Sequence, residues 1–112
     1  MGRTLICMSL VALALVAAPA SAQSRGGAQE LSNCAGAVAA FGNLNIVNYP
    51  RGAHGEWAPV LGALLDSMNR TEGLEGMTGR FAANAARSYW TERPRAEQEQ
   101  EANQCRARFG RQ

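Results

Sequence analysis

Two cysteines, Cys34 and Cys105, constrain the fold of this chain more than any other feature of its sequence. They lie 71 positions apart, so a bridge between them closes a long loop. In the chain-entropy model such a bridge stabilises the folded state by about 4 kcal/mol, against about 5–15 kcal/mol for the net stability of a whole small domain. No Cys-x-x-Cys spacing is present. We therefore predict a structural disulfide, with a redox pair or an intermolecular bridge as the alternatives.

The N-terminus has the parts of a secretory signal peptide. Arg3 provides the positive charge, an apolar segment runs from Leu5 to Ala18, and Ala20-Ser21-Ala22 matches a cleavage site. The apolar segment is shorter than the roughly 20 residues that span a bilayer, which favours cleavage over an uncleaved anchor. We expect residues 1–22 to be removed together with Cys7. Stable membrane insertion is then not expected, and the mature chain reaches the periplasm or the exterior, where paired cysteines oxidise.

The mature part, from Gln23 onward, is nearly neutral. All 11 cationic residues of the chain are arginines, one of them is Arg3, and 9 residues are acidic. This balance leaves no basic surface for nucleic acid, and the absence of lysine excludes Schiff-base chemistry. Arginine in place of lysine, with abundant alanine and glycine, is typical of a GC-rich bacterial genome.

Hydrophobic periodicity predicts an all-α fold, a small bundle of three to four helices whose first and last members are joined by the disulfide. Residues 23–29 are expected to be a disordered leader, and residues 30–112 a single helical domain. The expected helices run from Glu30 to about Gly42, from Trp57 to Arg70, from Leu74 or Thr78 to Glu92, and from Pro94 or Arg95 to Phe109. The last two are either separate or one rod kinked at Pro94.

Four apolar stripes are expected to form the core. The first helix has Leu31, Cys34, Val38 and Phe41. The second helix has the most regular one: Trp57, Val60, Leu61, Leu64, Leu65 and Met68. In the third helix the stripe is Leu74, Met77, Phe81, Ala85 and Tyr89. The last helix has only Ala102, Cys105 and Phe109, so we expect the disulfide to hold it in place.

Four residues near the end of the third helix form the first candidate contact patch: Arg87, Tyr89, Trp90 and Arg93. Tryptophan, tyrosine and arginine dominate the energetics of protein interfaces, and arginine also binds carboxylates and phosphates through two parallel hydrogen bonds. In the alternative reading, Trp90 caps the edge of the bundle and Arg93 is solvated.

The loop before the second helix is the second candidate, with Tyr49, His54 and Trp57. His54 and Glu56 could act as a general base with an orienting carboxylate, or could simply be solvated loop residues. The Pro-Cys-x-x-Cys half of the zinc-deaminase signature is absent. One histidine and a bridged cysteine pair do not make a metal site, so no metal or cofactor is predicted.

The sequence thus predicts a non-enzymatic helical protein that binds another macromolecule or assembles with itself. A first alternative is a small-ligand carrier or a stress chaperone. In size, helical content and single disulfide, the mature chain is similar to the small periplasmic acid-stress chaperones. A second alternative is an enzyme that uses His54 and Glu56.

Overall fold

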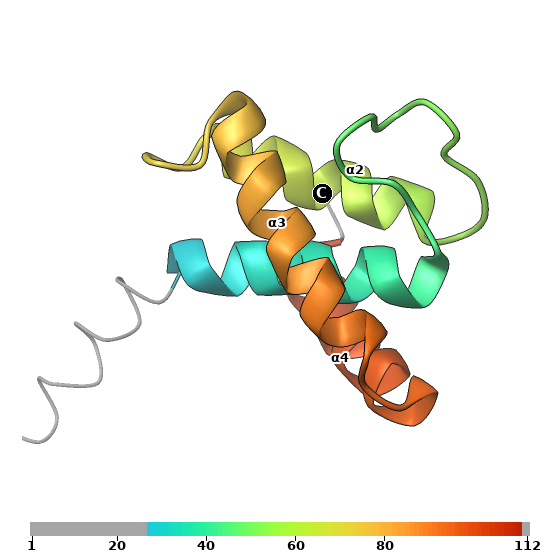
Figure 1. The fold of residues 1–112 in the computed structure, drawn as a ribbon. Coiled ribbons are helices and arrows are strands. Elements are labelled where there is room, and N and C mark those ends of the chain that lie inside the picture. The colour runs from blue at the N-terminus through green and yellow to red at the C-terminus, as the bar shows by residue number, and fades with distance from the viewer. Residues whose placement is uncertain (1–26, 111–112) are drawn as a thin grey trace, which may run out of the picture.

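The computed structural model describes residues 27–110, which form four helices and no strand (Figure 1). The first helix covers residues 27–42; α2 is Ala58–Asn69, α3 is Gly76–Thr91 and α4 is Arg95–Phe109. The predicted all-α bundle is confirmed. The predicted signal peptide, residues 1–22, and residues 23–26 lie outside the described residues.

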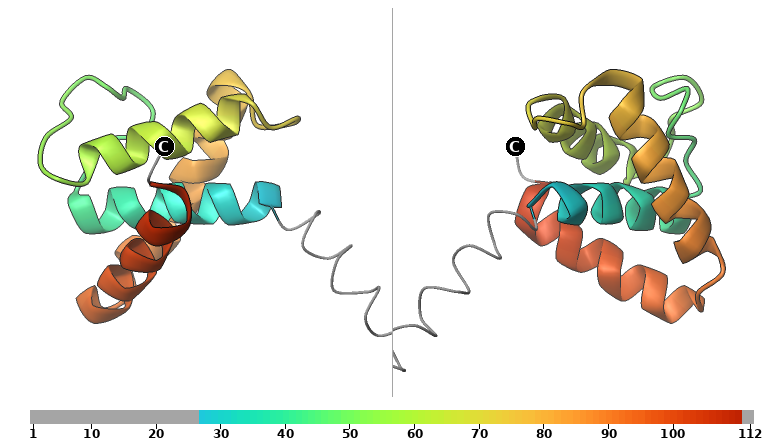
Figure 2. Two further views of the ribbon diagram at one scale, coloured as in Figure 1. Left: turned by 180° about the vertical axis from the view of Figure 1, so that it is seen from behind. Right: turned by 60° about the vertical axis from the view of Figure 1, so that its left-hand side comes forward.

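The first helix is central in the bundle. From Cys34 to Ala39 every residue is buried, as expected for a helix that is covered on all sides. Figure 1 shows α2 beside this helix and α3 crossing both. Figure 2, seen from behind, shows α4 on the side opposite to α3. The first helix therefore contacts each of the other three.

The start of the first helix corrects one prediction. Residues 27–29 are already helical, so the prediction of a disordered leader is wrong for these three residues. Ala28 and Gln29 have high helix propensity, and the next residue, Glu30, forms an ion pair with Arg108 of α4. That contact ties the first turn to the bundle.

The first helix ends at the predicted place for a local reason. Asn43 has a positive φ of 55°, and the Leu44 N–H donates to the Ala39 carbonyl at 2.8 Å while the Asn43 N–H donates to the Ala40 carbonyl. This pair of bonds is a Schellman motif, which satisfies carbonyls at a helix end. It also turns Leu44 into the core, where it is 1% exposed.

Helix α2 provides five of the buried core residues, and Trp57, directly before it, is a sixth. All six residues of its predicted stripe, Trp57 included, are buried, and Trp57 stacks edge-on against Phe41 of the first helix. The guanidinium of Arg106, from α4, lies 4.2 Å from the centre of the Trp57 ring on another side. Core packing and a cation–π contact therefore fix the N-terminal end of α2.

The disulfide joins the first and last helices as predicted. The Cys34–Cys105 bond spans Cα atoms 5.5 Å apart, and both cysteines are fully buried. A turn over residues 92–94 separates α3 from α4, so the two are distinct helices. The Gln98 amide holds this turn, because its Nε2 donates to the carbonyls of Trp90 and Arg93.

Arg80 fixes the loop between the first helix and α2. Its Nη1 lies 3.2 Å, 3.3 Å and 2.6 Å from the backbone carbonyl oxygens of Ile46, Val47 and Tyr49. Its guanidinium therefore ties α3 to this loop, and it shares the Ile46 carbonyl with the Tyr49 N–H, which donates there at 3.2 Å.

Replacing Arg80 by methionine is expected to lower the free energy of unfolding by about 2 kcal/mol. The substitution keeps the aliphatic stem but removes charge-assisted hydrogen bonds, each worth about 1.5–3 kcal/mol. Urea unfolding followed by circular dichroism measures the loss. Arg51→Met, at an exposed position of the same loop, is the control and should change stability by less than about 0.5 kcal/mol. Equal losses in the two variants would contradict the assignment.

Candidate interaction surface

Helix α3 presents its large apolar side chains to solvent. Met77 is 46% exposed, Phe81 59% and Tyr89 58%, and Ala85 is exposed as well. The prediction that this stripe faces the core is therefore wrong for these four residues, whereas Leu74, just before α3, packs against the core. Only Gly79 and Ala83 of α3 are buried.

The close approach of α3 to the first helix explains this orientation. A Cβ atom built on Gly36 would lie 2.5 Å from the Cβ of Ala86 and 2.5 Å from the backbone nitrogen of Arg87. At such a short separation only glycine and alanine fit between two helices. The small residues of α3 must therefore face inward, and the large ones are left on the opposite side.

The exposed residues form a continuous row, which we call the α3 ridge: Met77, Phe81, Ala85 and Tyr89. Residues four apart are neighbours on a helix surface, so these side chains follow one another over most of α3. Rows of this spacing interlock with a second helix in the commonest class of helix packing. The row carries no charge. The two arginines within α3 both point away from it: Arg80 donates to the loop carbonyls described above, and Arg87 Nε donates to the Leu44 carbonyl at 2.9 Å.

The structure divides the predicted patch between surface and interior. Tyr89 and Arg93 are exposed, and the Arg93 guanidinium lies 5.8 Å from the centre of the Tyr89 ring. Trp90 is half-buried and its indole N–H donates to Asn33 Oδ1 at 2.8 Å. Arg87 points towards the loop at Leu44. Two of the four predicted residues are thus on the surface with the α3 ridge, and the other two hold the helix in place.

The second candidate, the loop before α2, does not gather its residues at the surface. Trp57 is buried, and the Tyr49 hydroxyl donates to the Ala58 carbonyl at 3.0 Å. His54 is exposed with its Nδ1 3.0 Å from the Gly52 carbonyl, while the exposed Glu56 carboxylate lies 3.9 Å from Arg106. His54 and Glu56 therefore have separate partners, and this geometry lends no support to a general-base pair.

An apolar groove lies beside the α3 ridge, between α3 and the first half of the first helix. Its volume is about 500 Å³, and its walls include Ala28 and Ser32 on one side and Ala82 and Ala86 on the other, with Leu74 at one end. Ala82 and Ala86 are each three residues before a member of the ridge, so they neighbour it on the helix surface. Ridge and groove together make one apolar surface.

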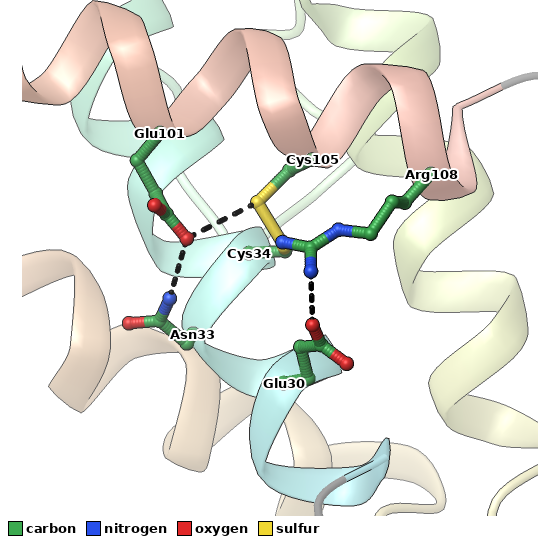
Figure 3. Close-up of polar contacts among 6 residues, drawn as sticks. All are labelled: Glu30, Asn33, Cys34, Glu101, Cys105 and Arg108. Atoms are coloured by element: carbon green, nitrogen blue, oxygen red, sulfur yellow. Dashed lines mark hydrogen bonds and ion pairs between the residues drawn. A yellow bond between two sulfur atoms is a disulfide. The ribbon is translucent and has the colours of Figure 1, made fainter. Parts of the chain in front are cut away.

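A polar cluster surrounds the disulfide (Figure 3), and its Asn33 also lines the groove. Asn33 Nδ2 donates to a Glu101 carboxylate oxygen at 3.0 Å, and that oxygen lies 3.7 Å from Cys105 Sγ. On the other sulfur, an Arg108 nitrogen lies 4.0 Å from Cys34 Sγ. Asn33 thus links Trp90 of α3 to Glu101 of α4.

Among residues 27–110, three side chains of types that can bind a metal come together in this cluster. Ligand atoms of Cys34, Glu101 and Cys105 lie within 4.8 Å of one another. Because the two sulfurs are bonded to each other, neither is a thiolate that could bind a metal. The cluster acts as a structural link between the first helix, α3 and α4.

Comparisons with protein-family models, with curated proteins and with solved structures find no match to this chain. Within residues 27–110, no helix has both the length and the apolar character needed to cross a bilayer.

Sequence reasoning missed Met77, Phe81 and Ala85 as surface residues, because periodicity alone shows that a helix has an apolar stripe and not which way it faces. The sequence does contain a signal for the orientation of this helix. Gly79 and Ala83, the two buried residues of α3, are small residues on the opposite side of the same helix. Small residues at helical spacing can pack a helix closely against another one, which leaves the large stripe available for something else.

Proposed function

We propose that this chain is an exported, non-enzymatic protein that works through protein–protein contact at the α3 ridge. The observation that carries the proposal is the exposure of Met77, Phe81 and Tyr89 in one row of one helix. Isolated exposed apolar residues are ordinary, whereas a contiguous apolar patch marks an interaction site. Aromatic side chains and methionine are also enriched at protein interfaces.

The surroundings of the ridge favour a protein over a membrane surface as the partner. Helices that lie on anionic membranes place lysine and arginine along the edges of their apolar face. Along the α3 ridge are uncharged residues such as Thr78, Asn84 and Ser88, while Arg80 and Arg87 are turned towards loop carbonyls. One exposed arginine, Arg93, lies near the ridge, at its C-terminal end beside Tyr89. A neutral apolar helix face fits another helix face of the same kind.

Export is part of the same proposal. Its support is the signal-peptide pattern of residues 1–22 together with the fully buried disulfide, because such bonds form and persist in the periplasm or outside the cell.

The test is a double substitution, Phe81→Ser with Tyr89→Ser. Both side chains are mostly exposed, so we expect the free energy of unfolding to change by less than about 0.5 kcal/mol. The protein is purified from the compartment to which it is exported. Its native mass spectra should show a complex for the wild-type chain and the bare monomer for the variant.

A matched control changes two exposed residues of α4, Glu99→Ser with Ala107→Ser, and should keep the complex. If the complex persists in the Phe81/Tyr89 variant, the α3 ridge is not the contact surface.

The apolar groove supports a second candidate, the carriage of a small apolar ligand. Its volume of about 500 Å³ falls within the range of ligand sites, and alanines form much of its walls. The same native mass spectra distinguish this candidate, since a carrier shows a small extra mass on the monomer. That mass should persist when Phe81 and Tyr89 are replaced, because neither residue lines the groove.

A further inference from the structure

We infer that the protein in contact with the α3 ridge is a second copy of this chain, with the two α3 helices packed antiparallel across a two-fold axis. This inference rests on the proposed function, because it names the partner of the same surface. It follows from the order of side chains along the ridge, from the charges near the ridge and from the amount of apolar surface that the ridge offers.

The order of side chains makes the ridge complementary to itself. Its midpoint lies between Phe81 and Ala85. A two-fold axis through that midpoint places Phe81 against Ala85 of the second copy, and Met77 against Tyr89 of the second copy. Each large side chain near the axis then meets a small one, as close packing requires. The outer pairs bring a thioether against an aromatic ring, which is a favourable contact.

The charges allow two identical faces to meet. Between Met77 and Tyr89 the only charged residues are Arg80 and Arg87, and both donate to carbonyls of the preceding loop. An isologous contact through this face therefore brings no like charges together at its centre. Arg70 and Glu75 lie near the start of α3, and Glu92 and Arg93 lie at its end. Antiparallel packing places these ends side by side, where Arg93 already forms an ion pair with Glu97 of its own chain at 3.1 Å.

The area of the ridge predicts a weak dimer. Taking about 200 Å² for a whole large side chain, the exposed parts of Met77, Phe81 and Tyr89 amount to about 300 Å² in each copy. Stable complexes bury about 800 Å² in each partner. We therefore expect a reversible dimer that forms at high protein concentration.

Cysteine cross-linking tests the geometry. Two single variants, Phe81→Cys and Ala85→Cys, are oxidised separately and as a mixture, and the products are separated by mass. Antiparallel pairing predicts that the mixed 81–85 dimer is at least several-fold more abundant than either homodimer, because only the mixed pair lies directly opposite across the axis. The native disulfide is not expected to interfere, since both of its sulfurs are buried. Glu99→Cys, on the exposed face of α4, mixed with Ala85→Cys, measures random cross-linking.

Each outcome decides the inference. A dominant mixed dimer supports it. A mixed yield no higher than that of the Glu99→Cys control, or an excess of the 81–81 homodimer as parallel packing would give, overturns it. Failure of this inference is distinguishable from failure of the proposed function. If the chain does not pair with itself but loses a complex with a different protein on Phe81→Ser with Tyr89→Ser, the ridge is a contact surface for another partner.

Discussion

Loss of the Cys34–Cys105 bridge is expected to lower the free energy of unfolding by about 4 kcal/mol. The bridge closes a loop of 71 positions, and the entropy that it removes from the unfolded chain sets this value. For a domain of this size that loss corresponds to a fall of roughly 15–30 °C in Tm. Cys34→Ala with Cys105→Ala, compared with the wild-type chain by urea unfolding, measures it.

The loss of stability should also differ between helices. Helix α4 buries only Gln98, Ala102 and Cys105, whereas α2 buries five apolar residues of its own. Without the bridge, α4 should detach first, and its amides should exchange with solvent faster than those of α2. The reduced wild-type chain is the matched control, because it lacks the bond but keeps both sulfur atoms. A loss below about 1 kcal/mol, or equal loss of protection in α2 and α4, would contradict this role of the bridge.

Adding one methyl group at Gly36 is expected to cost about 3 kcal/mol. The new Cβ would lie 2.5 Å from both the Cβ of Ala86 and the backbone nitrogen of Arg87, and a backbone atom cannot move aside without separating the first helix from α3. Thermal and urea unfolding of Gly36→Ala measure the cost.

Gly27→Ala is the control, because it is the same substitution in the same helix and nothing lies within 4 Å of the new atom. It should leave stability unchanged or raise it by up to about 1 kcal/mol. Adding Ala86→Gly to Gly36→Ala should restore only part of the loss, since the contact with the backbone nitrogen remains. Equal stability of the Gly36 and Gly27 variants would mean that the two helices are not in close contact.

The sequence predicts α2 and the disulfide well for physical reasons. The stripe of α2 packs against the first helix, so the side with the large apolar residues is also the buried side. The apolar periodicity therefore predicts the buried face of α2 correctly. The disulfide could be predicted because only two cysteines lie outside the predicted signal peptide, and paired cysteines form a bond in an oxidising compartment. The end of the first helix at Asn43 also follows from local chemistry, because asparagine tolerates a left-handed backbone conformation.

The orientation of α3 could not be predicted in the same way. Its stripe is as regular as that of α2, but the close crossing at Gly36 and Ala86 depends on residues 50 positions apart in the sequence. The roles of Arg80 and Arg87 are also long-range, since their acceptors are carbonyls of the loop that follows the first helix. Sequence patterns do not show which carbonyls a fold leaves without partners. Of the candidate patch, only Tyr89 and Arg93 lie at the surface with the ridge.

Sedimentation velocity of the oxidised mature chain over a wide range of concentrations tests the central claim most directly. The α3 ridge predicts that the mean sedimentation coefficient rises from the monomer value towards that of a dimer as the concentration increases. It also predicts that Phe81→Ser with Tyr89→Ser holds the chain at the monomer value while the Glu99/Ala107 control variant behaves like the wild type. Identical concentration dependence in the wild-type chain and the Phe81/Tyr89 variant would contradict self-association through the α3 ridge.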